Sequence, residues 1–195
     1  MFLYITFLTV AVVLSAAEEL NDDLCPAWGS MYCAKDIRSV DDLLVLNDFM
    51  LLEENEEELE KKCKNTVPYA KCVVDYGLKF CQKVSDNIHY QGFKYDYAAL
   101  SRVCNKNDEA RRWYMDNVKC LNKQKVSIHT KCEKTPRTYG LKDLTKEVCE
   151  IDKRRVECTF EEISKNCGNE ALKLVKLIML SYTKPVEKAC SKFEL

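Results

Sequence analysis

The chain has 195 residues, of which 31 are acidic and 30 are basic, so its formal net charge is close to zero. The basic residues are scattered rather than gathered in a recognisable motif, which argues against a nucleic-acid-binding protein. Only five glycines and four prolines occur, and no low-complexity linker divides the chain. We therefore expect a single folded domain after the N-terminal segment.

Residues 1–17 have the pattern of a secretory signal peptide. An apolar run ends at Leu14, and the small residues 15–17 follow it, where signal peptidase cleaves. That run is too short to cross a bilayer, and the later apolar stretch 172–182 is interrupted by two lysines. We expect residues 18–195 to form one secreted, extracellular, cysteine-rich domain with no membrane span.

Charge is distributed unevenly along this mature chain. Residues 18–62 include 14 acidic and 4 basic residues, a net charge of −10, whereas residues 63–195 include 17 acidic and 26 basic ones, a net charge of +9. We interpret this as an acidic N-terminal segment that packs over a basic body. The alternative is a separate cationic site for a partner.

Apolar residues recur at a spacing of three to four along the chain, and strand patterns are rare. This predicts an all-α fold, a disulfide-stapled helical bundle. The first helices are expected at about 43–52 and 53–63. Pro68 is then expected in the first turn of a new helix that runs to about Val84, which makes Cys63 the end of the helix before it.

The next helical stripe is aromatic and includes Tyr90, Phe93 and Tyr97. Such a stripe could line a pocket for a hydrophobic ligand, but we interpret it as core. Another helix is expected from about residue 107 to 121, followed by a loop at 135–140.

In the C-terminal part, Gly168 is expected to stop a helix. The helix that follows, at about 169–183, is apolar on more than one face, so we expect it to be the most buried. Lys184 and Pro185 should begin a tail that Cys190 holds in place.

All twelve cysteines follow the predicted cleavage site. An even number in an exported chain implies six disulfides. The cysteines are Cys25, Cys33, Cys63, Cys72, Cys81, Cys104, Cys120, Cys132, Cys149, Cys158, Cys167 and Cys190. Since Cys72 and Cys81 are nine residues apart on one helix, about two and a half turns, they should bond to different neighbours.

Two quartets of cysteines share one spacing. The gaps in residues 63–104 return in residues 149–190, with an offset of 86 at all four cysteines. This suggests a diverged internal repeat, in which two copies of one helical unit follow each other. If so, any bond within the first quartet should be copied within the second.

Motifs for chemistry are missing from the sequence. There is no Gly-x-Ser-x-Gly nucleophile elbow, no zinc-ligand spacing, and no calcium-loop pattern in the acidic run at 53–60. His89 and His129 lie far apart in sequence, and paired cysteines provide no free thiolate. We therefore predict a protein that is not an enzyme, with no catalytic, metal or cofactor site.

The run 59–63, the run from Cys72 to Tyr76, and Cys81, Cys104, Cys120 and Cys132 at long intervals resemble a known family. It is the secreted, cysteine-rich, helical domain family of nematodes and arthropods whose function is unknown, which is similar to haemolymph glycoproteins. The resemblance covers residues 25–190. It implies an extracellular, disulfide-bonded helical protein and no catalytic residues, although no Asn-x-Ser/Thr glycosylation site occurs.

From these features we expect a non-enzymatic secreted protein that binds another macromolecule, such as a component of haemolymph, saliva or venom. The alternative is an extracellular carrier of small hydrophobic ligands. An apolar cavity of several hundred cubic ångströms, lined by residues such as Tyr90, Phe93, Leu174 and Ile178, would favour the carrier.

Overall fold

The computed structural model describes residues 29–36, 43–44, 46, 52–81, 88–132 and 144–193. The predicted signal peptide, Cys25 and the predicted loop at 135–140 lie outside these ranges. The regular structure within them is helical, which confirms the all-α prediction. A helical segment at 29–33 leads into η1 (Ala34–Asp36), and the other elements are α2 (Glu56–Phe80), α3 (Ile88–Val103), α4 (Glu109–Cys132), α5 (Lys146–Ile178), α6 (Leu180–Cys190) and η4 (Ser191–Phe193).

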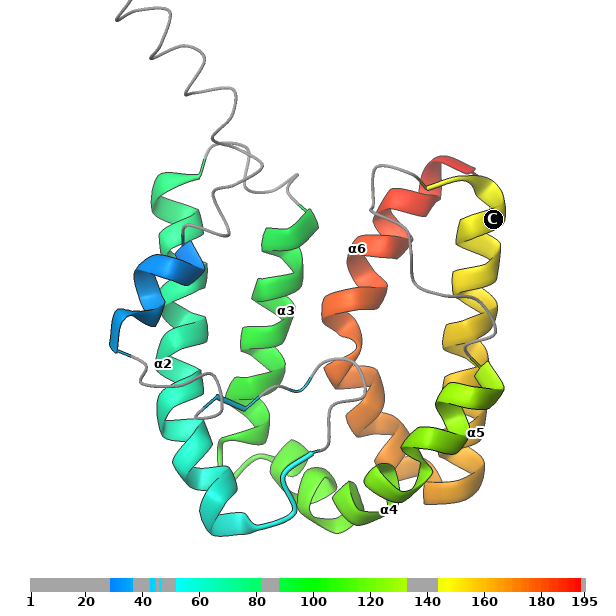
Figure 1. Ribbon diagram of the computed structural model, residues 1–195, viewed down its shortest axis with the longest axis horizontal. Helices are drawn as coiled ribbons and strands as arrows, with labels where there is room; N and C mark the ends of the chain where they lie inside the picture. Colours follow the sequence, from blue (N-terminus) through cyan, green and yellow to red (C-terminus); the bar gives the residue numbers. More distant parts are fainter. Residues whose placement is uncertain are drawn as a thin grey trace, which may run out of the picture.

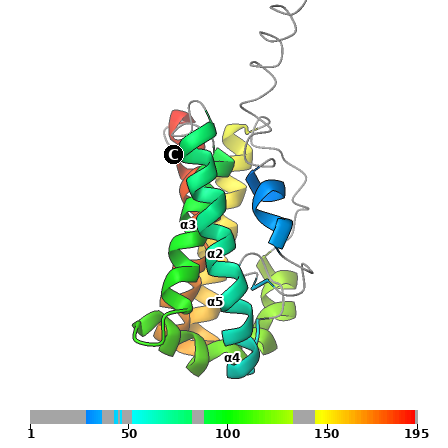
Figure 2. The same ribbon diagram turned by 90° about the vertical axis from the view of Figure 1, so that its left-hand side faces the viewer.

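Two antiparallel helical hairpins and one crossing helix make up the described molecule. Figure 1 shows α2 and α3 side by side in one hairpin, and the two halves of α5 with α6 in the other. Helix α4 runs across one end and joins the two hairpins. Figure 2, turned by 90°, shows the short helical segment at 29–36 beside α2.

The reversal of the chain within α5 occurs at Gly168. Its backbone has φ 87° and ψ −179°, a conformation that is almost restricted to glycine. This confirms the predicted helix break. It also divides α5 into an arm at 146–167 and a second arm at 169–178, which return past each other in Figure 1.

Two predicted helix boundaries at prolines are wrong. Helix α2 begins after Asn55, whose side chain accepts hydrogen bonds from the backbone N–H groups of Glu57 and Glu58, and it continues through Pro68 to Phe80. Similarly, Pro185 lies inside α6 rather than in a tail. A proline inside a helix removes one backbone hydrogen bond and costs about 3 kcal/mol.

Packing and disulfides on both sides of Pro68 offset that cost in α2. In α2, Leu59 is buried before Pro68 and Val73 after it. Disulfide-bonded Cys63 and Cys72 likewise lie on either side of Pro68. Local signals at proline are therefore overridden by tertiary contacts. The predicted helix at 43–52 is also wrong at the described positions 43, 44, 46 and 52, which are not helical.

Five disulfides join the described helical segments, and the cysteine count predicts six for the whole chain. The pairs are Cys33–Cys72, Cys63–Cys104, Cys120–Cys167, Cys132–Cys158 and Cys149–Cys190. Cys81 is disulfide-bonded as well. This density of cross-links is typical of proteins from oxidising, extracellular environments.

The disulfides of the two quartets follow one scheme. Cys63–Cys104 closes the α2–α3 hairpin and Cys149–Cys190 closes the α5–α6 hairpin, each across 41 residues. The second cysteine of each quartet bonds to a helical segment that precedes its hairpin. The copied bond is the one that the repeat hypothesis requires, and the duplication itself stays a hypothesis.

The most buried helix is α4 and not, as predicted, the helix at 169–183. Residues of α4 contact both hairpins, and Tyr114, Val118 and Ile128 are among the largest fully buried side chains. On the second arm of α5, by contrast, Lys173 and Lys176 are exposed. The burial predicted from its apolar composition is therefore too high, because the lysines of that arm face solvent.

The acidic start of α2 pairs with the basic start of α4. The guanidinium of Arg111 is almost fully buried and lies 3.3 Å from the Glu56 carboxylate and 3.8 Å from that of Glu60. Glu60 also pairs with Lys106. Glu56 and Glu60, which belong to the acidic N-terminal segment, thus pair with residues of the basic body. Among the described helices, none is long and apolar enough to cross a membrane.

Candidate functional site

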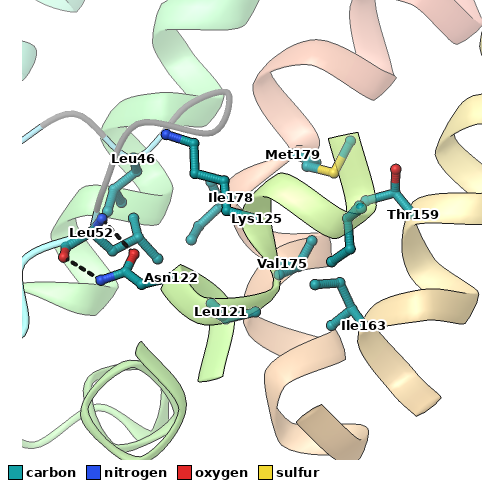
Figure 3. A pocket seen from close by; sticks show the side chains of 11 residues that line it. Leu46, Leu52, Leu121, Asn122, Lys125, Thr159, Ile163, Val175, Ile178 and Met179 are labelled. Carbon is teal, nitrogen blue, oxygen red and sulfur yellow. Dashed lines mark hydrogen bonds between the residues drawn. The ribbon is translucent and has the colours of Figure 1, made fainter. Parts of the chain in front are cut away.

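An apolar pocket lies between α4, the two arms of α5 and the segment that precedes α2. Its cavity volume is about 80 Å³, and it is partly open to solvent. Figure 3 shows side chains from all of these elements pointing toward a common space. The lining residues are Leu46, Leu52, Leu121, Asn122, Lys125, Ile128, Thr159, Ile163, Val175, Ile178 and Met179.

Helical periodicity and the Gly168 reversal bring this lining together. On α4, Leu121, Lys125 and Ile128 share one face because they follow a spacing of four and three. On α5, Ile163 belongs to the first arm and Val175 to the second, so the two meet only because the helix turns back at Gly168. The wall is therefore a property of the hairpin packed on α4.

Two side chains fix the non-helical wall of the pocket. The Oδ1 of Asn122 accepts a hydrogen bond from the Leu52 N–H (2.9 Å), and its Nδ2 donates to the Leu52 carbonyl oxygen (2.9 Å). Closer to the N-terminus, the hydroxyl of Thr66 on α2 accepts a hydrogen bond from the Leu44 N–H (2.6 Å). The wall is thus attached at one point to α2 and at another to α4.

The polar side chains of the lining differ in how fully they are used. Asn122 also donates to a carboxylate oxygen of Glu54 (2.8 Å), so both of its polar atoms are occupied. The hydroxyl of Thr159 donates to the Arg155 carbonyl oxygen one turn earlier on α5 (2.9 Å). For Lys125, no hydrogen bond or ion pair is found within the described part of the chain.

The residues that the sequence suggested as a pocket lining lie mostly elsewhere. Tyr90 is buried between α3 and α2, where its hydroxyl donates to the Val74 carbonyl oxygen (3.1 Å). Its ring packs so closely on Gly77 that a Cβ at Gly77 would lie 2.3 Å from it. Leu174 is fully buried in the core. Of the four residues suggested from the sequence, only Ile178 lines the pocket.

Chemically, the lining is mostly apolar and holds no carboxylate or histidine, and Lys125 is its one ionisable side chain. Elsewhere, Arg155 and Tyr182 both donate to the carboxylate of Asp152 in a polar cluster between α5 and α6. His129 is exposed on α4. No group of three or more His, Cys, Asp or Glu side chains in the described ranges is arranged to hold a metal ion.

A second surface feature is an aromatic cluster on α2 and the segment at 29–33. The rings of Tyr32 and Tyr76 are 5.4 Å apart, and those of Tyr76 and Phe80 are 4.8 Å apart. Tyr32 and Phe80 are each more than half exposed. Lys35 lies over Tyr32 and Lys79 over Phe80, so the cluster is flanked by positive charge.

Comparisons of the chain with protein-family models, with curated proteins and with solved structures found no match. The pocket and the surface themselves are therefore the basis for inferring the function. Sequence reasoning missed Asn122, Lys125 and Thr159, because their role in the lining depends on contacts between segments far apart in the chain. A usable signal was Gly168, since a break that reverses a helix brings its two apolar faces together.

Proposed function

We propose that this is a secreted, non-enzymatic binding protein that holds a small hydrophobic ligand in the pocket between α4 and the arms of α5. The observation that supports this proposal is the pocket itself, an apolar space that is partly open to solvent and lies inside a fold cross-linked by disulfides. Two of these bonds, Cys120–Cys167 and Cys132–Cys158, tie α4 to the first arm of α5. They would hold the two main walls together as ligands enter and leave.

The pocket is smaller than the cavity of several hundred cubic ångströms expected of a carrier, and its size limits the ligand. Whole drug-sized ligands occupy cavities of roughly 300 Å³ or more. An apolar cavity of roughly 150 Å³ can bind benzene. The cavity volume of this pocket is smaller, about 80 Å³. The ligand that fits best is therefore a slender one, with the end of an alkyl chain inside and the remainder at the open side.

The proposal is tested by titrating octan-1-ol, an uncharged probe, into the protein and following methyl NMR signals. We expect saturable shifts at the methyl groups of Leu121, Ile163 and Val175, which line the pocket from three elements. Replacing Val175 by phenylalanine should fill the pocket and abolish the shifts. A matched control is Val126→Phe, because Val126 is exposed and does not line the pocket. Unsaturable shifts, or equal shifts in both variants, would contradict the proposal.

The second candidate function is binding of another macromolecule, and the aromatic cluster favours it. Exposed tyrosine and phenylalanine provide large contact areas at low cost in conformational entropy, and aromatic side chains are enriched at protein interfaces. A rigid, disulfide-bonded hairpin beneath Tyr76 and Phe80 would present them without rearrangement. The resemblance to the secreted helical family of nematodes and arthropods is also a hypothesis, and it identifies no particular partner.

This candidate is tested with protein purified from its natural extracellular fluid. A partner bound through the cluster should be recovered in stoichiometric amount with the wild type, and lost when Tyr32 and Phe80 are both replaced by alanine. Val126→Ala, at an exposed site on α4, should retain it. Equal recovery with all three proteins would place the interface elsewhere.

A further inference from the structure

We propose that the pocket selects amphiphiles with an anionic headgroup, which Lys125 pairs. This inference rests on the proposed function, because it names the class of ligand for the same site. It follows from the hydrogen-bonding state of the three polar side chains in the lining, Asn122, Thr159 and Lys125. Each can be followed to its partners among the described residues.

Asn122 has no hydrogen-bond donor left for a ligand in its present position. Its Nδ2 donates to Leu52 and to Glu54, and its Oδ1 accepts from Leu52. A side-chain amide has two N–H donors, and both are used here. Asn122 therefore belongs to the wall of the pocket and holds the segment at 52–54.

Thr159 can accept but not donate. Its single hydroxyl proton points to the Arg155 carbonyl oxygen in the preceding turn of α5, 2.9 Å away. The remaining lone pairs could accept a hydrogen bond, yet Thr159 is almost completely buried at 3% exposure. A hydroxyl in this position is better suited to the deep side of the pocket than to its mouth.

Lys125 is left as the side-chain donor of the lining with no partner in the described part of the chain. Figure 3 shows its stem beside the pocket and its amino group at the side of Leu46, away from Ile163 and Val175. Lysine stems commonly cover apolar surface while the charged end stays in contact with water. A ligand with its chain between α4 and α5 would bring its polar end to this amino group.

The unpaired ammonium group calls for an acceptor, and its positive charge favours an anion. No carboxylate lines the pocket, and Glu54, whose carboxylate contacts the lining residue Asn122, accepts a hydrogen bond from that residue. A charge-assisted hydrogen bond is stronger than a neutral one. The shared chemistry is an alkyl chain with one anionic end, which fits both a fatty-acid carboxylate and an alkyl phosphate.

The test measures binding of four eight-carbon probes by titration calorimetry: octanoate, octyl phosphate, octan-1-ol and octylammonium. We expect octanoate or octyl phosphate to bind roughly tenfold more tightly than octan-1-ol, and octylammonium to bind most weakly. Lys125→Met keeps the length of the apolar stem but removes the charge. It should remove the preference for anions, so that octanoate, octyl phosphate and octan-1-ol bind this variant with similar affinity.

The control variant is Lys123→Met, which makes the same change at an exposed site on α4 outside the lining. It should keep the preference. Higher salt should weaken the binding of the anions more than that of octan-1-ol, because the amino group is at the solvent side.

Each outcome separates this inference from the proposed function. A preference for both anions means that Lys125 recognises the negative charge and does not distinguish the headgroups. A preference for octanoate alone, or for octyl phosphate alone, identifies the headgroup. Either result supports the inference. If octan-1-ol binds as tightly as both anions, or if Lys125→Met keeps the preference, the inference is wrong while the pocket still binds apolar chains. If no probe binds, both are wrong.

Discussion

At the level of single residues, Asn122 is the main attachment of the pocket wall. Replacing it by alanine removes its hydrogen bonds to Leu52 and Glu54. At about 1 kcal/mol for each bond, we expect a loss of about 2–3 kcal/mol in the free energy of unfolding. Urea denaturation measures this loss. Binding of octan-1-ol should also weaken, because Leu52 would no longer be held over the pocket.

Asn166→Ala is the control for this prediction. The Nδ2 of Asn166 bonds within its own helix, to the Glu162 carbonyl oxygen, and the residue is exposed. Its replacement should change stability and binding little. If Asn122→Ala were no more destabilising than Asn166→Ala, the wall would not depend on this side chain.

Asp96 on α3 provides a residue-level prediction about pH. Burial raises the pKa of its carboxyl above the ordinary value of 3.8, although a hydrogen bond with Ser181 on α6 acts in the opposite direction. A carboxyl with a raised pKa binds its proton more tightly in the folded state. Its contribution to stability is therefore complete below about pH 3.8 and is lost as the pH rises through the folded-state pKa.

Ionisation of Asp96 as the pH rises should thus weaken the contact between α3 and α6. We expect Asp96→Asn to be more stable than the wild type at pH 7, with a difference that shrinks as the pH falls toward 3.8. Thermal unfolding across this pH range measures both effects. Asp116→Asn, at an exposed position on α4, should show neither. A less stable Asp96→Asn at pH 7 would refute this assignment.

At the level of secondary-structure elements, the reversal at Gly168 determines whether the pocket exists. A Cβ added there would have no neighbour within 4 Å, so any penalty for alanine comes from the backbone conformation alone. For this region of φ and ψ the cost is about 1–3 kcal/mol. We expect Gly168→Ala to lower stability by this amount and to weaken binding of octan-1-ol, as the arms of α5 shift.

The control for Gly168→Ala is Lys165→Ala, an exposed position three residues earlier on α5. Alanine is a better helix former than lysine by only a small margin, so this variant should keep wild-type stability. If Gly168→Ala were equally stable, the positive φ of Gly168 would not be required by the fold.

At the level of the whole molecule, the two hairpins can be compared through their closing disulfides. Cys63–Cys104 and Cys149–Cys190 each span 41 residues. In the chain-entropy model, loops of that length gain about 4 kcal/mol from the cross-link. Replacing either pair by alanines should therefore cost a similar amount, measured by denaturant unfolding. Very unequal losses would indicate that the hairpins are not equivalent units.

The sequence predicted the features that depend on local pattern and cysteine arithmetic. Helical spacing identified the fold class, and the repeated gaps anticipated that Cys63–Cys104 would have a counterpart in Cys149–Cys190. The prediction from sequence was wrong at Pro68 and Pro185, where contacts outside the local sequence keep the helices continuous.

The pocket could not be predicted because no local motif encodes it. Its lining combines Leu46 and Leu52, one face of α4 and both arms of α5. These segments meet through the reversal at Gly168 and the hydrogen bonds of Asn122. Tyr90 and Phe93, the aromatic residues that suggested a pocket, do not line it. Aromatic composition alone does not distinguish a filled core from a cavity.

The central claim, that the pocket binds the apolar chain of a ligand, is tested most directly by a crystal structure with 8-bromooctanoate. Anomalous scattering locates the bromine independently of the interpretation of the remaining density. The account predicts one bromine peak between Leu121, Ile163 and Val175, with the carboxylate toward Lys125. A bromine peak on another surface, with the pocket empty, would contradict it.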